Sequence, residues 1–320
     1  MTAPTPPAPP PPPRPVPPSG AAARPHPAGV PDHAPSSADL GMLLVCLIWG
    51  ANFSVVKGAF EYLPALAFTG VRFALSSAFL YLLVRWRYGA VTFPPGLTGR
   101  LIWLGVLGNT LYQIAFTLAL LWSTATNTAL ILATMPAVVT VLAGVRRIER
   151  VTPRMWAGTA LATLGVALVI STGGLEFSAA TLKGDACAVA AVIFWSVYTL
   201  GLRRIPASVP PLTTTALTTL TGTPGLVLAG LVPIVGVDWL HVPAPAWGAL
   251  AYSSFLSLVV AYFIWNASVQ RVGGTRTAIY MCLTPLVAAL TAWATLGERL
   301  VPLQGVGAAL ILTGVLMTRR

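Results

Sequence analysis

Two apolar stretches of the chain carry polar and aromatic side chains at helical spacing. Within residues 101–121, Asn109, Tyr112, Gln113 and Phe116 follow one another at i, i+3, i+4 and i+7, which places them on one face of a helix. Amide, phenol and aromatic groups can hydrogen-bond to a bound molecule and stack against it. Catalysis would need a nucleophile with a positioned base, paired carboxylates or metal ligands, and this face has none of these. The pattern favours a binding cavity over an active site.

The second stretch, residues 246–269, repeats this character with Ser254, Ser257, Tyr262, Trp265 and Asn266. Two pairs one turn apart, Trp49 with Asn52 and Trp195 with Tyr198, extend the candidate lining. One alternative is that these groups only join packed helices, at about 0.6 kcal/mol per hydrogen bond. Another is that the aromatic residues anchor helices at a membrane interface. We favour the cavity, because Asn52 and Tyr198 lie in the middle of their apolar stretches.

Three more residues are unusual for apolar segments. Arg72 lies well inside the segment 63–84, where it can attract a carboxylate or phosphate of a substrate or be held by carbonyls and polar neighbours. The second, structural role is favoured. Pro136 and Pro285 lie within the segments 124–145 and 274–296, and each frees a carbonyl one turn back. They are candidate gating hinges, with plain packing kinks as an equal alternative.

The elements that position these residues must cross a membrane. The chain is 56% hydrophobic and 8% charged, whereas soluble domains are about 25% charged. Residues 101–145 contain no Asp, Glu, Lys or Arg, and as one helix they would extend about 67 Å, more than twice the ~30 Å hydrocarbon core. They therefore form two spans. The same reasoning predicts an all-α integral membrane protein with about ten transmembrane helices, at 40–58, 63–84, 101–121, 124–145, 155–173, 185–202, 211–236, 246–269, 274–296 and 301–318.

The distribution of basic residues predicts the orientation. The net charge is +11. With the N-terminus inside, fifteen Lys and Arg fall in cytoplasmic segments and three, Lys57, Lys183 and Arg299, in outside loops. Because Lys and Arg of short loops collect on the cytoplasmic side, both termini are predicted to be cytoplasmic. The positive charge is not clustered with stacking aromatics, which excludes a nucleic-acid partner.

The two halves of the chain repeat each other. Residues 126–166 and 275–315, which lie 149 positions apart, are identical at fourteen of forty-one positions. The shared positions include Glu149 and Glu298, each followed by Arg, which we interpret as an ion pair or a loop clamp at the membrane surface. The matching glycines allow close helix approach, within the chain or in a homodimer, with packing within the chain favoured: Gly158, Gly165, Gly307 and Gly314.

The first spans of the two halves echo each other more weakly. WGANFSVVK (49–57) matches WSVYTLGLR (195–203) at an offset of 146. At the offset of 149, Gln113 matches Tyr262. Each copy holds five spans, and since five is odd, the second copy enters the membrane in the opposite direction. The sequence therefore predicts two inverted five-helix repeats, a recurring plan of secondary transporters.

The first 38 residues differ from the rest. Residues 1–36 hold 15 of the 29 prolines, so we expect a disordered, partly polyproline tail, either inert or a docking site for a proline-reading domain. The predicted organisation is this tail at 1–38, a first five-helix repeat at 39–174 and a second at 184–320. The three cysteines lie in apolar segments, with no spacing for a disulfide or metal site. We expect no cofactor.

These motifs together resemble the EamA-type transporters of the drug/metabolite transporter superfamily over about residues 40–318. The resemblance rests on WGANFSVVK, VRF (71–73), the pair TNTALILATMP and TRTAIYMCLTP, and the pair IERVTP and GERLVP. It implies ten helices in two inverted repeats, a plasma-membrane carrier, and substrates such as amino acids or other small metabolites, often exported. The RRIER of the first copy departs from the family's Gly before the Glu, and we expect no effect on function.

The sequence thus predicts a secondary-type carrier that moves small metabolites, with efflux by alternating access, and an exporter of amphipathic drugs is the alternative. The expected partners are a small-molecule substrate and the lipid bilayer. A membrane-embedded enzyme is disfavoured because no catalytic groups converge in the spans, and a sensor or scaffold has no need for inverted halves. No Asp or Glu lies deep in a span. We therefore expect facilitated diffusion or exchange rather than coupling through a buried carboxylate.

Overall fold

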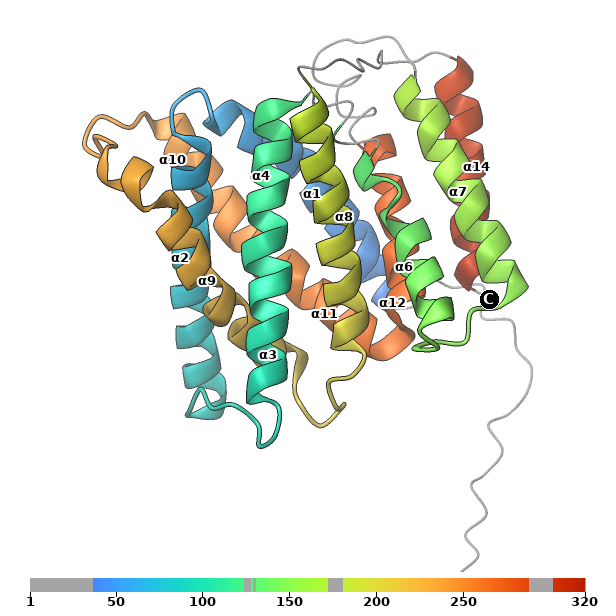
Figure 1. Cartoon of the computed structure of the whole chain (residues 1–320), viewed down its shortest axis with the longest axis horizontal. Helices are drawn as coiled ribbons and strands as arrows, with labels where there is room; N and C mark the ends of the chain where they lie inside the picture. The colour runs from blue at the N-terminus through green and yellow to red at the C-terminus, as the bar shows by residue number, and fades with distance from the viewer. Residues whose placement is uncertain (1–36, 124–127, 129–130, 172–180, 288–301, 320) are drawn as a thin grey trace, which may run out of the picture. The chain divides into compact units, whose positions relative to one another are not determined.

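All secondary structure in the described residues is helical, as predicted. A computed structural model describes residues 37–123, 128, 131–171, 181–287 and 302–319 (Figure 1). A helix satisfies its backbone N–H and C=O groups internally, which a chain in lipid requires. The α-helices are α1 (Ser37–Ala59), α2 (Ala65–Tyr88), α3 (Thr98–Gly105), α4 (Tyr112–Trp122), α6 (Met135–Val145), α7 (Pro153–Ser171), α8 (Leu182–Leu202), α9 (Pro211–Val235), α10 (Ala244–Ala251), α11 (Ala261–Val272), α12 (Gly274–Ala278) and α14 (Pro302–Arg319).

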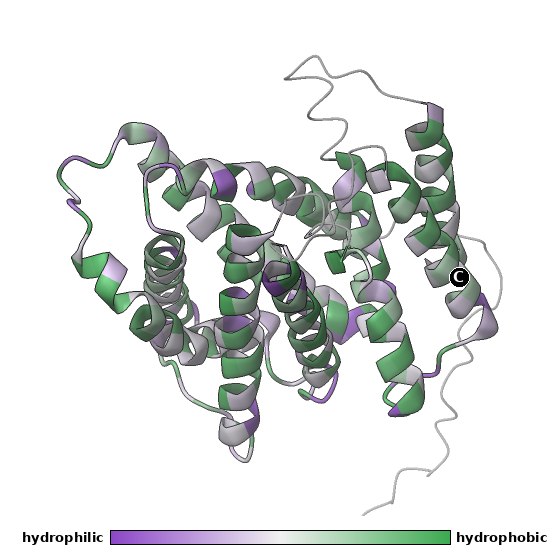
Figure 2. Ribbon diagram, turned by 45° about the horizontal axis from the view of Figure 1, so that its top comes forward, coloured by the Kyte–Doolittle hydropathy of each residue, from purple (hydrophilic) through white to green (hydrophobic). Residues whose placement is uncertain are grey.

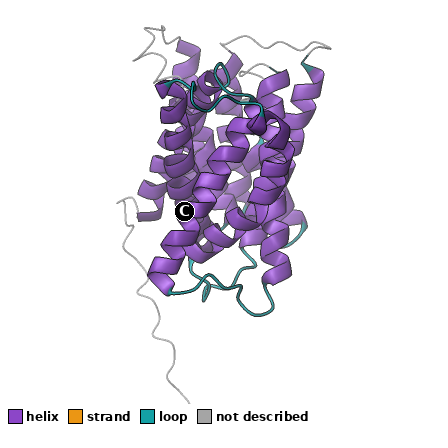
Figure 3. Cartoon of the chain, turned by 90° about the vertical axis from the view of Figure 1, so that its left-hand side faces the viewer, coloured by secondary structure: helices purple, strands orange, loops and turns teal. Residues whose placement is uncertain are grey.

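Six helical stretches in the described part are long and apolar enough to cross a membrane. They are Ala38–Ala59, Ala65–Tyr88, Thr98–Trp122, Leu182–Leu202, Pro211–Val235 and Ala244–Val272. Figure 2 shows hydrophobic residues along most of their length, and Figure 3 shows the loops at the two ends of the helices. Six of the predicted spans are therefore found. Of the other four, 155–173 and 301–318 correspond to α7 and α14, whereas parts of 124–145 and 274–296 lie outside the described residues.

Two of the long stretches contain a π-helical segment. The π-helix η1 (Val106–Leu111) joins α3 to α4, and η2 (Tyr252–Val260) joins α10 to α11. At the offset of 149, η1 corresponds to residues 255–260, which lie within η2. A π-helical turn widens the helix locally and is frequent at functional sites. Each segment ends close to a predicted cavity residue: η1 ends directly before Tyr112, and η2 ends two residues before Tyr262.

Helices α7 and α14 lie side by side (Figure 1), and their backbones come into contact at glycines. A Cβ on Gly158 would lie 2.7 Å from the carbonyl oxygen of Gly314, and one on Gly165 would lie 2.6 Å from that of Gly307. The order of these contacts makes the two helices antiparallel. Only glycine permits so close an approach. The predicted role of these glycines in packing within the chain is confirmed.

The two prolines differ from their predicted place in mid-helix. Pro136 lies in the first turn of α6, after a turn at residues 133–134. A missing N–H costs nothing there, because the first amides of a helix have no partner within the helix. Pro285 lies in a helical run at residues 284–287, directly after the 3-10 helix η3 (Ile279–Leu283). Each proline therefore follows a change of helix type or a break rather than bending a continuous α-helix.

Candidate functional site

Several of the predicted residues meet around one internal cavity of about 60 Å³. Helices α1, α2, α4, α6 and α8 contribute to its wall, together with η2, α11 and η3. Of the predicted residues, the cavity brings together Asn52, Arg72, Tyr112, Gln113, Trp195, Ser257 and Tyr262. The other lining residues are Trp49, Phe53, Phe116, Leu132, Met135 and Met281.

Aromatic rings form much of the wall. The ring of Trp195 lies 4.6 Å from that of Tyr112, 5.3 Å from that of Tyr262 and 5.8 Å from that of Trp49, between centroids. The last pair meets edge to face, at an interplanar angle of 78°. Such edge-to-face and tilted contacts are the arrangements that aromatic pairs prefer. The rings therefore hold one another in place and present a rigid, apolar surface with polar edges.

A chain of hydrogen bonds crosses this wall. The Arg72 guanidinium donates from Nη2 to Oε1 of Gln113 over 2.7 Å, and Nε2 of Gln113 donates to the Tyr262 hydroxyl over 2.9 Å. Gln113 and Tyr262 are equivalent positions of the two sequence repeats, 149 residues apart. The amide of Gln113 is oriented by these two partners, because its oxygen faces a donor and its nitrogen faces an acceptor.

Arg72 is buried in this wall, although charged side chains are rare in the interior of a membrane protein. The residue is 1% exposed, and its guanidinium lies 5.6 Å from the ring centre of Phe68 and 5.8 Å from that of Phe73. Within the described residues its Nε has no hydrogen-bond partner. None of the thirteen residues that line the cavity is acidic. A buried cation without a facing carboxylate favours binding of an anionic group.

Four predicted residues support the wall instead of lining it. The Tyr198 hydroxyl donates to Oδ1 of Asn266 over 3.0 Å, and Nδ2 of Asn266 donates to Oγ1 of Thr215 over 2.8 Å. Nδ2 of Asn109 donates to the carbonyl of Thr218 over 2.8 Å. The ring of Trp265 packs 5.4 Å from that of Trp49 and 5.5 Å from that of Trp195. For Asn109 and Asn266, joining of packed helices describes the contacts better than lining.

The sequence patterns missed four apolar lining residues. Phe53, Leu132, Met135 and Met281 line the cavity but stand in segments where most residues are apolar, so nothing distinguishes them by type. One signal was available. Leu132 and Met281 are equivalent at the offset of 149, so finding one cavity residue points to the other.

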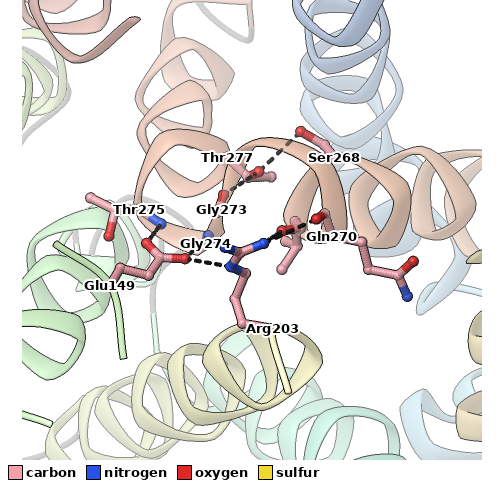
Figure 4. Close-up of polar contacts among 9 residues, drawn as sticks. Glu149, Arg203, Ser268, Gln270, Gly273, Gly274, Thr275 and Thr277 are labelled. Atoms are coloured by element: carbon pink, nitrogen blue, oxygen red, sulfur yellow. Dashed lines mark hydrogen bonds and ion pairs between the residues drawn. The ribbon is translucent and has the colours of Figure 1, made fainter. Parts of the chain in front are cut away.

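A second polar cluster, outside this cavity, joins three segments that are distant in sequence (Figure 4). The Glu149 carboxylate accepts hydrogen bonds from the amides of Gly274, over 2.5 Å, and Thr275, over 3.0 Å, and forms an ion pair of 3.1 Å with Nε of Arg203. Arg203 also donates to the carbonyl of Gln270 over 3.0 Å. For Glu149 the predicted loop clamp is confirmed, but its charge partner is Arg203, directly after α8, rather than the neighbouring Arg150. The matching pair Glu298 and Arg299 lies outside the described residues.

The backbone of Gly273 allows this cluster to form. Its φ is +101°, in the region that favours glycine. This turn ends α11 and directs the first amides of α12 towards the Glu149 carboxylate, 2.9 Å from the place where a Gly273 Cβ would stand. We refer to Glu149, Arg203, Gly273, Gly274 and Thr275 below as the Glu149 clamp.

Apolar helices long enough to cross a membrane, around a buried polar and aromatic cavity, are typical of a multi-pass membrane protein with an internal cavity. The sequence profile of the EamA-like transporter family matches the chain twice, over residues 36–171 and 182–320. The chain therefore belongs to the EamA-like transporter family. The names of the family and of its relatives indicate a transporter rather than an enzyme. The predicted resemblance is confirmed.

Curated relatives agree with this assignment, and a solved structure shares the fold. An uncharacterized transporter of Archaeoglobus fulgidus is 31% identical over 285 residues, which cover 88% of this chain and 97% of the relative. A probable amino-acid metabolite efflux pump of Escherichia coli is 28% identical, over 85% of this chain and 91% of the relative. One crystal structure covers 89% of this chain and 98% of its own with a TM-score of 0.74. At 18% identity it shows a shared fold and no more.

Proposed function

We propose that this protein is a secondary-type carrier of the plasma membrane that exports small metabolites such as amino acids by alternating access. The observation that carries the proposal is the position of the Arg72–Gln113–Tyr262 chain on the cavity wall. It places a cation and two hydrogen-bonding groups beside an aromatic surface. An amino acid offers a carboxylate for the first and an apolar side chain for the second.

Contacts between equivalent positions support a plan of two inverted five-helix repeats, 39–174 and 184–320. In such a plan a pseudo-twofold axis relates the halves, and residues near the axis meet their own equivalents. Three such pairs are in contact, at offsets of 146 or 149: Gln113 with Tyr262, Trp49 with Trp195, and Ser77 with Thr223. The equivalent helices α7 and α14 run antiparallel, which is the direction that inversion requires.

Transport then requires the halves to move around the cavity. Ligand pockets commonly measure about 300–1,000 Å³, whereas this cavity measures about 60 Å³, so the helices must separate before a metabolite fits. The Glu149 clamp holds the loop after α6 to the ends of α8 and α11. With both termini in the cytoplasm, as the basic residues predict, the clamp lies on the cytoplasmic side. It closes that side in this conformation.

The substrate class rests on the chemistry of the cavity. Arg72 favours a carboxylate, and the name of the Escherichia coli relative, a probable amino-acid metabolite efflux pump, fits this chemistry. An exporter of amphipathic drugs is the alternative, since the aromatic wall would also take a hydrophobic compound. Such a compound has no carboxylate and would therefore leave Arg72 without an anionic partner. We expect facilitated diffusion or exchange, without coupling through a buried carboxylate.

Uptake into proteoliposomes tests the proposal. The full chain is reconstituted, and saturable uptake of labelled amino acids is compared with that of their decarboxylated amines, with and without a pH gradient. We expect amino acids to be taken up and amines to fail, with no acceleration by the gradient. The variant Arg72→Gln should lose amino-acid uptake, while the matched control Arg87→Gln, which changes an exposed residue at the end of α2, should keep it.

Other results would contradict the proposal at different points. Equal uptake of amines and acids would remove the role of Arg72 as an anion-binding group. Uptake that appears only under a pH gradient would show proton coupling. Transport of amphipathic cations alone would favour the drug exporter.

A further inference from the structure

A second cavity, larger than the first, opens between α3, α6 and α8. It measures about 250 Å³. Its lining comes from the start of α3, the end of α6 with the following loop, and the last turns of α8 with the residues after it. These are the helix ends that the basic residues assign to the cytoplasmic membrane surface. The cavity shares no lining residue with the Arg72 cavity.

Three arginines surround this cavity. Arg100 lies in the first turn of α3, Arg146 directly follows α6, and Arg204 lies two residues after α8. None of its ten lining residues, all of them in the described part of the chain, is acidic. The nearest acid in sequence, Glu149, is held by Arg203 in the clamp. The cavity therefore gathers three positive charges without a carboxylate among them.

The guanidinium of Arg100 is held in place at the cavity. Its Nη1 donates to the carbonyl of Arg204 over 2.9 Å, which joins the start of α3 to the segment after α8. A guanidinium carries five N–H donors in a planar fork that suits phosphate oxygens. One of these donors is used here, so others can serve a ligand.

The rest of the wall is apolar and continues onto the outer surface of the helices. Leu104, Leu142 and Leu200 lie inside, whereas Trp103 is 57% exposed and Val197 is 38% exposed. In a transmembrane helix such exposed apolar residues face acyl chains. A ligand of this cavity thus meets positive charge at the membrane surface and hydrocarbon below it.

We propose that this cavity binds the headgroup of an anionic phospholipid, with the phosphate at Arg100, Arg146 and Arg204 and an acyl chain along Trp103 and Val197. Basic cavities between transmembrane helices on the cytoplasmic side are suited to such headgroups. A soluble anion would use the three arginines alone. The continuous apolar path to the bilayer is what favours a lipid.

The bound lipid would also stabilise one conformation of the carrier. The cavity adjoins the Glu149 clamp, since Ile148 precedes Glu149 and Arg204 follows Arg203. A headgroup that bridges the ends of α3, α6 and α8 therefore holds together two of the segments that the clamp joins, the end of α6 with its loop and the end of α8. The lipid favours the arrangement in which the cytoplasmic side is closed.

Native mass spectrometry of the purified full chain tests the site. Phosphatidylglycerol and phosphatidylcholine with the same acyl chains are titrated separately. We expect wild type to prefer phosphatidylglycerol, and the triple variant Arg100→Gln/Arg146→Gln/Arg204→Gln to lose at least about tenfold in affinity for it. The matched control Arg85→Gln/Arg87→Gln/Arg271→Gln removes the same charge from exposed positions that the basic residues assign to the same side, and it should keep the preference.

The remaining arms separate the alternatives. An equal loss in the control variant would show general charge attraction and overturn the site. Displacement of the lipid by 10 mM inorganic phosphate would show a site for a free anion instead. Equal binding of the two lipids by wild type would show no preference for negative charge and would overturn the proposal. If the triple variant does not fold, Arg146→Gln alone decides: a reduced preference supports the site, and an unchanged one overturns it.

Discussion

Loss of the charge on Glu149 should open the side of the carrier that the Glu149 clamp closes. Among the described residues the carboxylate has three partners, the amides of Gly274 and Thr275 and the guanidinium of Arg203. In Glu149→Gln one oxygen becomes an NH₂ group, which is a donor and cannot accept from an amide. At least one hydrogen bond to a charged acceptor is lost, worth about 1.5–3 kcal/mol.

The ion pair adds little to this sum. The Arg203 side chain is 34% exposed, and an ion pair open to solvent contributes about 0–1 kcal/mol. A total near 2 kcal/mol corresponds to a shift of roughly 30-fold in the ratio of open to closed forms. The open fraction should rise by this factor as long as the closed form remains the major one.

A cysteine beneath the clamp can report the open fraction. The methyl group of Thr199 would lie 3.3 Å from a Cβ on Gly274, and the Thr199 hydroxyl is buried without a hydrogen-bond partner in the described residues. Thr199→Cys is therefore a mild change. It is made in a chain without Cys46, Cys187 and Cys282, and its reaction with a membrane-impermeant maleimide is measured in inside-out vesicles.

The labelling rate of Thr199→Cys should increase roughly 30-fold when Glu149→Gln is added. The control Glu61→Gln changes an exposed acid two residues after the C-terminal end of α1, away from the clamp, and should leave the labelling rate unchanged. A rate within about threefold of the parent, in a variant that is still folded and monodisperse, would refute the reasoning. It would mean that the clamp is not what closes this side.

Three further outcomes are expected. Gln113→Leu should abolish transport and lower the melting temperature in detergent, because it removes a hydrogen bond to a charged group worth about 1.5–3 kcal/mol; unchanged melting would contradict this. Gly165→Ala places a Cβ 2.6 Å from the Gly307 carbonyl and should cost about 1–3 kcal/mol by overpacking. The control Gly248→Ala has nothing within 4 Å of its Cβ and should be neutral in the same thermal assay. Deletion of residues 1–36 should leave uptake intact; its loss would give the tail a role in transport.

Much of the candidate site followed from local patterns. The period of 3.6 residues per turn predicted that Tyr112 and Gln113 share a face with Asn109. Asn109 lies in the π-helix η1, however, where this period does not hold. Which of them reaches the cavity did not follow. Gln113 faces Arg72 and Tyr262, whereas Asn109 turns to the carbonyl of Thr218 on α9.

The hydropathy pattern alone determined that this is an all-helical membrane protein, since the ~30 Å apolar core dictates the length and composition of each span. Its place among the transporters followed from the family motifs, and the family match confirms it. Only the tertiary structure decided that Arg203 rather than Arg150 meets Glu149, and that Phe53 and Met281 line the cavity. In lipid-exposed helices nearly every residue is apolar, so residue type says little about which face packs inward. That choice depends on the contacts between helices distant in sequence, and glycines such as Gly165 and Gly307 decide how closely those helices approach.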